Sequence, residues 1–170
     1  VGFHQAYVTL KNFMGQAVDA KIGRQQVVLD GHRLFGHTGW TDGGQSSDAI
    51  RLDHAAGNHT ISYVFVAGVE NESATTTTKA NVDFHILRAN TQGVLGGDLT
   101  GMFVMVDDQA TGGDTFENGQ QWYTIGARQK GKLGGLDYRV EYYHQFGDGA
   151  VEANNTNFTA AYTNLNDSAD

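Results

Sequence analysis

The chain is built from short runs in which apolar and polar residues alternate, joined by connections of two unlike lengths. The connections over residues 12–16, 56–58 and 130–135 are short, whereas those over 28–47, 70–81 and 108–119 are long and polar. Alternation with a period of two predicts β-strands. We predict strands over residues 5–11, 17–27, 48–55, 59–69, 82–89, 98–107, 120–129 and 136–146, with a possible ninth strand over 159–165.

The alternation of short and long connections gives the predicted sheet two unlike ends. Tight turns at one end and long polar loops at the other are typical of the transmembrane β-barrels of the bacterial outer membrane. No run of residues shows the 3.6-residue period of an amphipathic helix over three turns. We therefore predict an all-β, antiparallel, up-and-down transmembrane barrel or a segment of one, and a soluble antiparallel sandwich is the alternative.

Each predicted strand carries an apolar stripe on one face and polar or charged residues on the other. In the strand over 48–55, Ile50 and Leu52 oppose Arg51 and Asp53. In the strand over 82–89, Val82, Phe84 and Ile86 are assigned to the apolar stripe, with Asp83 and His85 opposite. A barrel would turn the charged face towards its lumen, and a sandwich would turn it towards water. The charged positions opposite the apolar stripes are Asp19, Lys21, Arg51, Asp53, Asp83, Asp137, Arg139 and Glu141.

Composition narrows the class of protein further. The 170 residues are 39% hydrophobic, which suits a single domain over 1–170, and no apolar run approaches the ~18 residues of a membrane helix. The net charge of −8 gives no sign of a nucleic-acid partner. The chain has no cysteine, which excludes disulfides and thiolate metal sites. Because the chain starts without a signal peptide and beside a strand, we expect it to be part of a larger barrel.

Catalytic and metal-binding motifs are scarce. The seven histidines form no H-x-x-x-H or H-E-x-x-H pattern, and no G-x-S-x-G elbow occurs, so no enzymatic activity is predicted. One long loop gathers carboxylates among glycines, which are features that calcium sites share. No cofactor is expected apart from calcium, for which the candidate ligands are Asp107, Asp108, Asp114 and Glu117.

The first third of the chain carries a set of distinctive motifs: QAYVTLK over 5–11, AKIGRQ over 20–25, RLFG over 33–36 followed by Trp40, and SDAIRL over 47–52. This combination resembles the alginate-export family of outer-membrane porins. The resemblance implies an outer-membrane location and passive passage of an anionic or polar solute, such as the anionic polysaccharide alginate. Family barrels have about 16 to 18 strands, so outer-membrane lipid and further barrel segments or envelope proteins are the expected partners.

The resemblance also implies a lumen lined by basic residues, because the planar guanidinium group of arginine binds carboxylates in a fork. Strand parity places Lys21, Arg51, Arg128 and Arg139 on the lumen side. Alternation places Arg24 on the apolar side of its strand, but Arg24 matches the arginine of the family's G-R-Q motif, so it joins the predicted anion-binding set. Alternation also places Arg88 on the apolar side of its strand. The alternative is that these arginines pair structurally with acids of the lumen.

Two further functions stay open at this point. A soluble or surface-exposed sandwich would bind glycans or protein partners through its long loops. A purely structural barrel would serve as one component of a larger envelope assembly.

Overall fold

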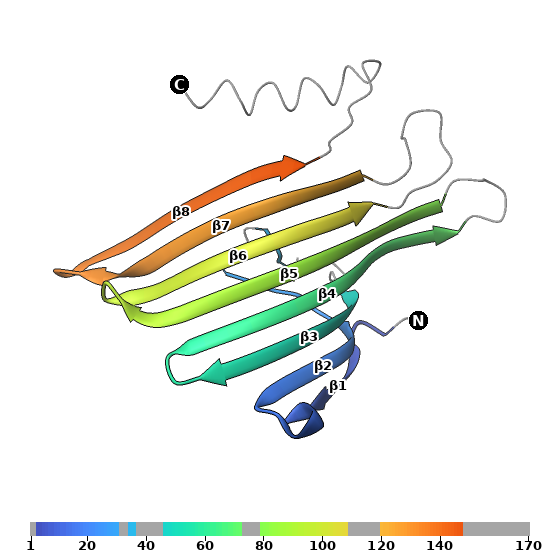
Figure 1. The fold of residues 1–170 in the computed structure, drawn as a ribbon, viewed down its shortest axis with the longest axis horizontal. Helices are drawn as coiled ribbons and strands as arrows, with labels where there is room; N and C mark the ends of the chain where they lie inside the picture. Colours follow the sequence, from blue (N-terminus) through green and yellow to red (C-terminus); the bar gives the residue numbers. More distant parts are fainter. Residues whose placement is uncertain (1–2, 31–33, 37–45, 73–78, 109–119, 148–170) are drawn as a thin grey trace, which may run out of the picture.

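The described residues of the computed structural model, 3–30, 34–36, 46–72, 79–108 and 120–147, form one antiparallel sheet (Figure 1). A single 3-10 turn, Phe13–Gly15, is the helical element in this part of the chain. No helix among these residues is long and apolar enough to cross a membrane. The strands are β1 (Ala6–Leu10), β2 (Val18–Gln25), β3 (Ser47–Ala56), β4 (His59–Glu72), β5 (Lys79–Val94), β6 (Gly97–Asp108), β7 (Gln120–Leu133) and β8 (Leu136–Gly147).

The strand order in the sheet is the order in the sequence, β1 to β8, and each strand pairs antiparallel with the next. This up-and-down connectivity confirms the predicted fold class. The eight strands belong to one sheet rather than to two packed sheets, so the sandwich alternative is wrong. Strands β1 and β8 are the two edges of the sheet, as expected for a segment of a barrel. The possible strand over 159–165 lies outside the described residues.

The short connections are tighter than predicted because the strands run further into them. Strand β5 continues to Val94 and β7 continues to Leu133, so two residues remain for each turn. Leu95-Gly96 and Gly134-Gly135 both have positive φ at their two positions, which is the type I′ geometry that suits the right-handed twist of a hairpin. A two-residue turn also joins β3 to β4. At the other end β4 extends to Glu72, beyond a bulge after Ala67.

The register defines two faces of the sheet. One row of paired residues runs through Ile22, Ile50 and Phe65, and the neighbouring row, through Lys21, Arg51 and Val64, points to the opposite side. We call the first the open face. Its large apolar side chains are exposed, for example Ile125 at 52% and Val140 at 66%.

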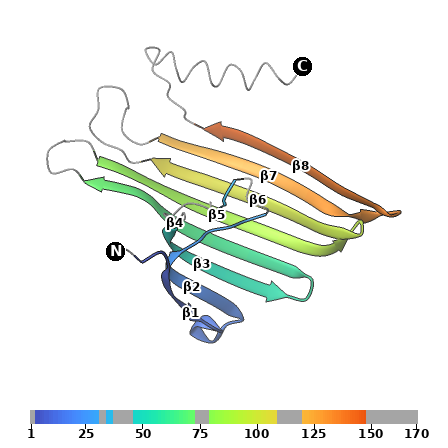
Figure 2. The same ribbon diagram turned by 180° about the vertical axis from the view of Figure 1, so that it is seen from behind.

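The second face is partly covered by the chain itself, and we call it the covered face. Residues 26–30 and 34–36, which we call the crossing segment, run over β4, β5 and β6 (Figure 2). The backbone N–H of Leu29 donates to the carbonyl of Phe35 (3.1 Å), and the Phe35 ring meets Phe84 edge-on. The core of the molecule lies beneath this segment, and its buried members are Leu29, Ala49, Val64, Val66, Ile86, Met102, Val104 and Val106.

The apolar residues of β5 lie on the opposite face of the sheet from the one predicted. Ile86 pairs with Val64 and Phe84 pairs with Val66, so these two residues lie on the covered face together with Arg51. His85 instead pairs with Phe65 on the open face. The alternation within the strand was predicted correctly, but its apolar stripe packs under the crossing segment and not with the other apolar stripes.

Candidate functional site

A network of charged side chains lies on the covered face, near the end of the sheet with the short turns. Arg128 of β7 pairs in the register with Glu141 of β8, and its Nε lies 3.1 Å from Glu141 Oε1. Arg139, two residues before Glu141 on the same face of β8, brings its Nε to 2.5 Å from the same oxygen. The antiparallel register therefore places two guanidinium groups around one carboxylate.

Asp30 of the crossing segment extends this network from above the sheet. Nε and Nη2 of Arg88 on β5 donate to its two carboxylate oxygens, at 2.8 and 2.7 Å. Arg128 Nη1 donates to the backbone carbonyl of Asp30 and lies 4.0 Å from Asp30 Oδ1. Asp30 thus links the arginines of two strands that are separated by β6.

The network is largely removed from water, apart from Arg139, whose side chain is 49% exposed. The side chains of Asp30 and Glu141 are each 8% exposed, and those of Arg128 and Arg88 are 10% and 18% exposed. Buried charges are stable only when they are paired and hydrogen-bonded. Among the described residues, three guanidinium groups against two carboxylates give the network a net charge of one positive unit. We call these five side chains the arginine cluster: Asp30, Arg88, Arg128, Arg139 and Glu141.

Two further basic residues of the predicted set lie on the covered face at the β1–β3 side of the sheet. Lys21 Nζ lies 3.7 Å from the centre of the Tyr7 ring, a cation–π contact. Arg51 Nε donates to Asp53 Oδ2 at 2.8 Å, and Ser62 Oγ donates to the other oxygen of Asp53 at 2.6 Å. Four of the five predicted residues (Lys21, Arg51, Arg128 and Arg139) therefore share one face of the sheet.

Arg24 is the exception in the predicted anion-binding set. Its register partners are Ala6 and Asp48 on the open face, and it forms a two-pronged pair with Asp48 through Nε (3.1 Å) and Nη2 (2.8 Å). The side chains are 48% and 59% exposed. Arg24 thus lies on the side opposite the arginine cluster, as its parity indicated.

The prediction from the sequence missed two members of the cluster. Arg88 follows the parity of Ile86 and was therefore assigned with it to the apolar stripe. Asp30 lies in a long connection that carries no alternation. The apolar residues Val27, Leu29 and Phe35 were the available signal, because an apolar group in an otherwise polar loop needs a surface to pack against.

The predicted calcium ligands are only partly within the described chain. Asp107 pairs with Asp83 and Gln121 on the open face, whereas Asp108 pairs with Val82 and Gln120 on the covered face. Asp114 and Glu117 lie outside the described residues. No group of three or more potential metal ligands occurs within the described ranges. A calcium site in this loop therefore stays a prediction.

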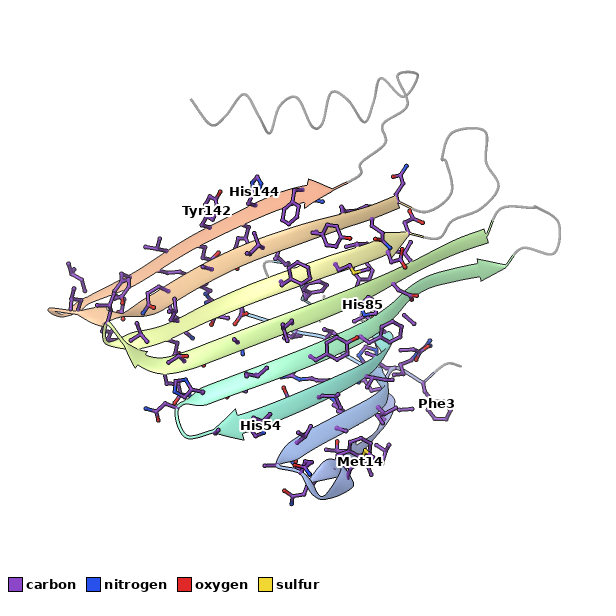
Figure 3. The ribbon with its side chains drawn as sticks, viewed as in Figure 1. Phe3, Met14, His54, His85, Tyr142 and His144 are labelled. Carbon is purple, nitrogen blue, oxygen red and sulfur yellow. The ribbon has the colours of Figure 1, made fainter. Side chains whose placement is uncertain are left out.

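The open face carries a band of aromatic rings towards the end of the sheet with the long connections. His85 lies 5.1 Å from Phe65, ring centre to ring centre, and its Nδ1 lies 2.8 Å from the Tyr63 hydroxyl. On the neighbouring strands Tyr123 stacks with both Phe103 and Phe146. His85, Tyr142 and His144 are labelled on this face in Figure 3. Rings gathered along one level of a barrel wall are typical of the membrane–water interface.

These features define a class of protein. An up-and-down antiparallel sheet with an exposed apolar face, an aromatic band and two-residue turns at one end has the construction of a transmembrane β-barrel. The family model described as Alginate export matches residues 1–166, and the chain therefore belongs to the alginate export family. This is a transport family of the bacterial outer membrane. No curated protein and no solved structure matches the chain.

Proposed function

We propose that this chain forms part of the wall of an outer-membrane channel for an anionic polysaccharide, and that its covered face lines the lumen. The observation that carries the proposal is the arginine cluster on the covered face, a net positive and largely buried network on the side opposite the exposed apolar residues. The family match makes alginate, whose sugar units each carry a carboxylate, the favoured solute.

The two faces support this orientation by their chemistry. Exposed Ile, Leu, Val and aromatic side chains on the open face would be costly in water, whereas hydrocarbon accepts them. Charged side chains such as Arg51, Arg128 and Arg139 would be costly in hydrocarbon, and lie on the other face. A lumen on the covered face therefore satisfies both sets of side chains.

The proposed mechanism is passive diffusion without covalent chemistry or cofactors. An anion that enters a narrow pore loses part of its hydration, and fixed positive charges offset that loss. Guanidinium groups suit this role because they bind a carboxylate through two parallel hydrogen bonds and stay charged at all relevant pH values. Arg51, Arg128 and Arg139 each lie beside an acid, so a passing carboxylate exchanges with neighbouring charges rather than binding irreversibly.

The test is electrical. The protein is reconstituted into planar lipid bilayers, and single-channel conductance is recorded in KCl with and without a mannuronate trisaccharide. The expected result is an anion-selective conductance that the trisaccharide reduces in a concentration-dependent manner. Maltotriose, a neutral trisaccharide, is the matched solute control and is expected to have a much smaller effect. A folded, membrane-inserted protein that carries no current contradicts the proposal and favours a structural role.

A further inference from the structure

Asp30 holds its carboxylate between two arginines of the covered face. It lies against Arg88 on β5 and Arg128 on β7, both of which point to the same side of the sheet. Asp30 itself belongs to no strand; it reaches this position through the crossing segment. The wall of the sheet thus supplies two cations, and a separate piece of chain supplies the anion between them.

The geometry at Asp30 is that of carboxylate recognition. Arg88 uses two nitrogens, Nε and Nη2, for the two oxygens of the carboxylate, at 2.8 and 2.7 Å. This side-on fork is specific for planar anions with two oxygens. A uronate group has the same planar carboxylate and the same charge as an aspartate side chain, so it fits the same fork.

Arg128, one of the two arginines around the Asp30 carboxylate, is also held in place by contacts that do not involve Asp30. Arg128 is oriented by Glu141, at 3.1 Å, and Glu141 is shared with Arg139. If Asp30 moved away, Glu141 would still balance part of the charge of these two arginines. Arg88 would lose the carboxylate that both of its forked nitrogens bind. The position therefore keeps its shape and gains affinity for an incoming carboxylate.

The segment next to Asp30 is anchored independently of the Asp30 carboxylate. Leu29 is buried in the core, and its backbone N–H donates to the carbonyl of Phe35. Asp30 itself has a φ of +47°, in the left-handed region that aspartate, unlike most residues with a side chain, adopts as a single residue. Leu29 can therefore stay in the core while the Asp30 side chain leaves the fork of Arg88.

From these contacts we propose that Arg88 and Arg128 form a carboxylate-binding site for the polysaccharide, and that Asp30 is its occupant in the resting protein. A uronate carboxylate displaces Asp30 and takes over the fork of Arg88. The solute cannot bind while Asp30 occupies the site. The apparent affinity for the solute is therefore the intrinsic affinity multiplied by the fraction of molecules in which the site is free. This proposal rests on the proposed function, since it names the group in the lumen that competes with the solute.

The chain contains a matched control for the experiment. Arg24 and Asp48 form the same kind of forked pair, with distances of 3.1 and 2.8 Å, but on the open face. Asp48→Asn removes one carboxylate from a forked arginine pair, as Asp30→Asn does, without touching the covered face. Asp30→Glu is the second control, because it retains a carboxylate that can occupy the site.

The experiment measures binding of a mannuronate trisaccharide to the purified protein in detergent by isothermal titration calorimetry, together with the half-blocking concentration in bilayers. Asp30→Asn is expected to lower both the dissociation constant and the half-blocking concentration by about tenfold. This change corresponds to a site that Asp30 occupies in about nine of ten resting molecules. Asp48→Asn and Asp30→Glu are expected to stay within about twofold of the unchanged protein. Arg88→Gln is expected to weaken binding, because the fork is lost.

The two proposals fail in different ways. Equal trisaccharide affinity of Asp30→Asn and the unchanged protein, both conducting, would overturn the occupant role of Asp30 and leave the channel intact. Tighter binding by Asp30→Asn without any current would instead support the site and overturn the channel. Folding of every variant is verified by its heat-sensitive migration in gels and its β-sheet circular dichroism, and Asp30→Ser replaces Asp30→Asn if the latter does not fold.

Discussion

Gly126 on β7 and Tyr143 on β8 are register partners, and the tyrosine ring fills the space that a side chain at Gly126 would need. A Cβ built on Gly126 would lie 2.1 Å from Tyr143 Cδ1, far inside van der Waals contact. The absence of a side chain at one position thus permits a large ring to lie flat along the covered face. The sheet next to the arginine cluster is closely packed for this reason.

Gly126→Ala is expected to destabilise the protein by about 1–3 kcal/mol, the usual cost of overpacking a tight site. The measurement is urea unfolding in phospholipid vesicles, followed by circular dichroism. Gly101→Ala on β6 is the control, because a Cβ there meets no atom within 4 Å. Equal unfolding midpoints for the two variants would mean that Tyr143 moves aside without cost.

The crossing segment is expected to depend on Leu29 for its attachment. Leu29→Ala removes a side chain that is 4% exposed within the core, and such substitutions cost about 2–5 kcal/mol. The expected result is faster proteolysis within the crossing segment in the membrane-embedded protein. Leu34→Ala, in the same segment but 43% exposed, is expected to change the cleavage rate little. Equal cleavage of both variants would contradict the anchoring role.

Charge removal is expected to change ion selectivity on the covered face but not on the open face. Arg51→Gln and Arg139→Gln should each lower the chloride-to-potassium permeability ratio by about twofold to fivefold, since one charge about 4 Å away in water contributes about 1 kcal/mol. Arg24→Gln on the open face should leave the ratio unchanged. The ratio is obtained from the reversal potential in a KCl gradient. A drop with Arg24→Gln alone would reverse the assignment of the lumen.

Binding of the mannuronate trisaccharide is expected to weaken as salt rises. The screening length falls from about 10 Å at ~0.1 M to about 3 Å at ~1 M salt, so the field of the arginine cluster reaches fewer solute molecules. The half-blocking concentration should therefore rise several-fold over this range, while the weak effect of maltotriose should stay constant. A block that is independent of salt would indicate that contacts other than charge hold the sugar.

The turn between β5 and β6 offers a stabilising substitution. Leu95 has a φ of +48° and is 68% exposed, so its side chain gains little and strains the backbone. Leu95→Asn produces the Asn-Gly pair that type I′ turns prefer, and should stabilise the protein by about 1 kcal/mol. The same urea experiment measures the gain. Leu136→Asn, at an exposed position without positive φ beside the next turn, should give no gain.

Much of the fold follows from the sequence because strand alternation and turn residues are local signals. The alternation predicted that Arg51 and Asp53 share a face, and the glycines predicted the short turns. Which face Ile86 joins is not a local property. An apolar stripe packs equally well against hydrocarbon or against the crossing segment, and only the pairing of Ile86 with Val64 decides between them.

The site was predictable only in part for a related reason. Alternating apolar and polar residues in the strands of Arg128 and Arg139 assigned both arginines to the polar face. The structure places both beside Glu141. Asp30 reaches the cluster through tertiary packing of Leu29 and Phe35, which no strand pattern encodes. The alternation also placed Arg24 correctly on the face opposite Arg51 and Arg128.

The crossing segment also sets an order of assembly. Every strand pairs with its neighbour in sequence, so hairpins can form one after another as the chain becomes available. Asp30, however, contacts Arg128, which lies 98 residues further along the chain. The segment after β2 therefore has to wait for β5 and β7 before it finds its charged partners, so a connection that is synthesised before six of the eight strands docks only after β7 is in place.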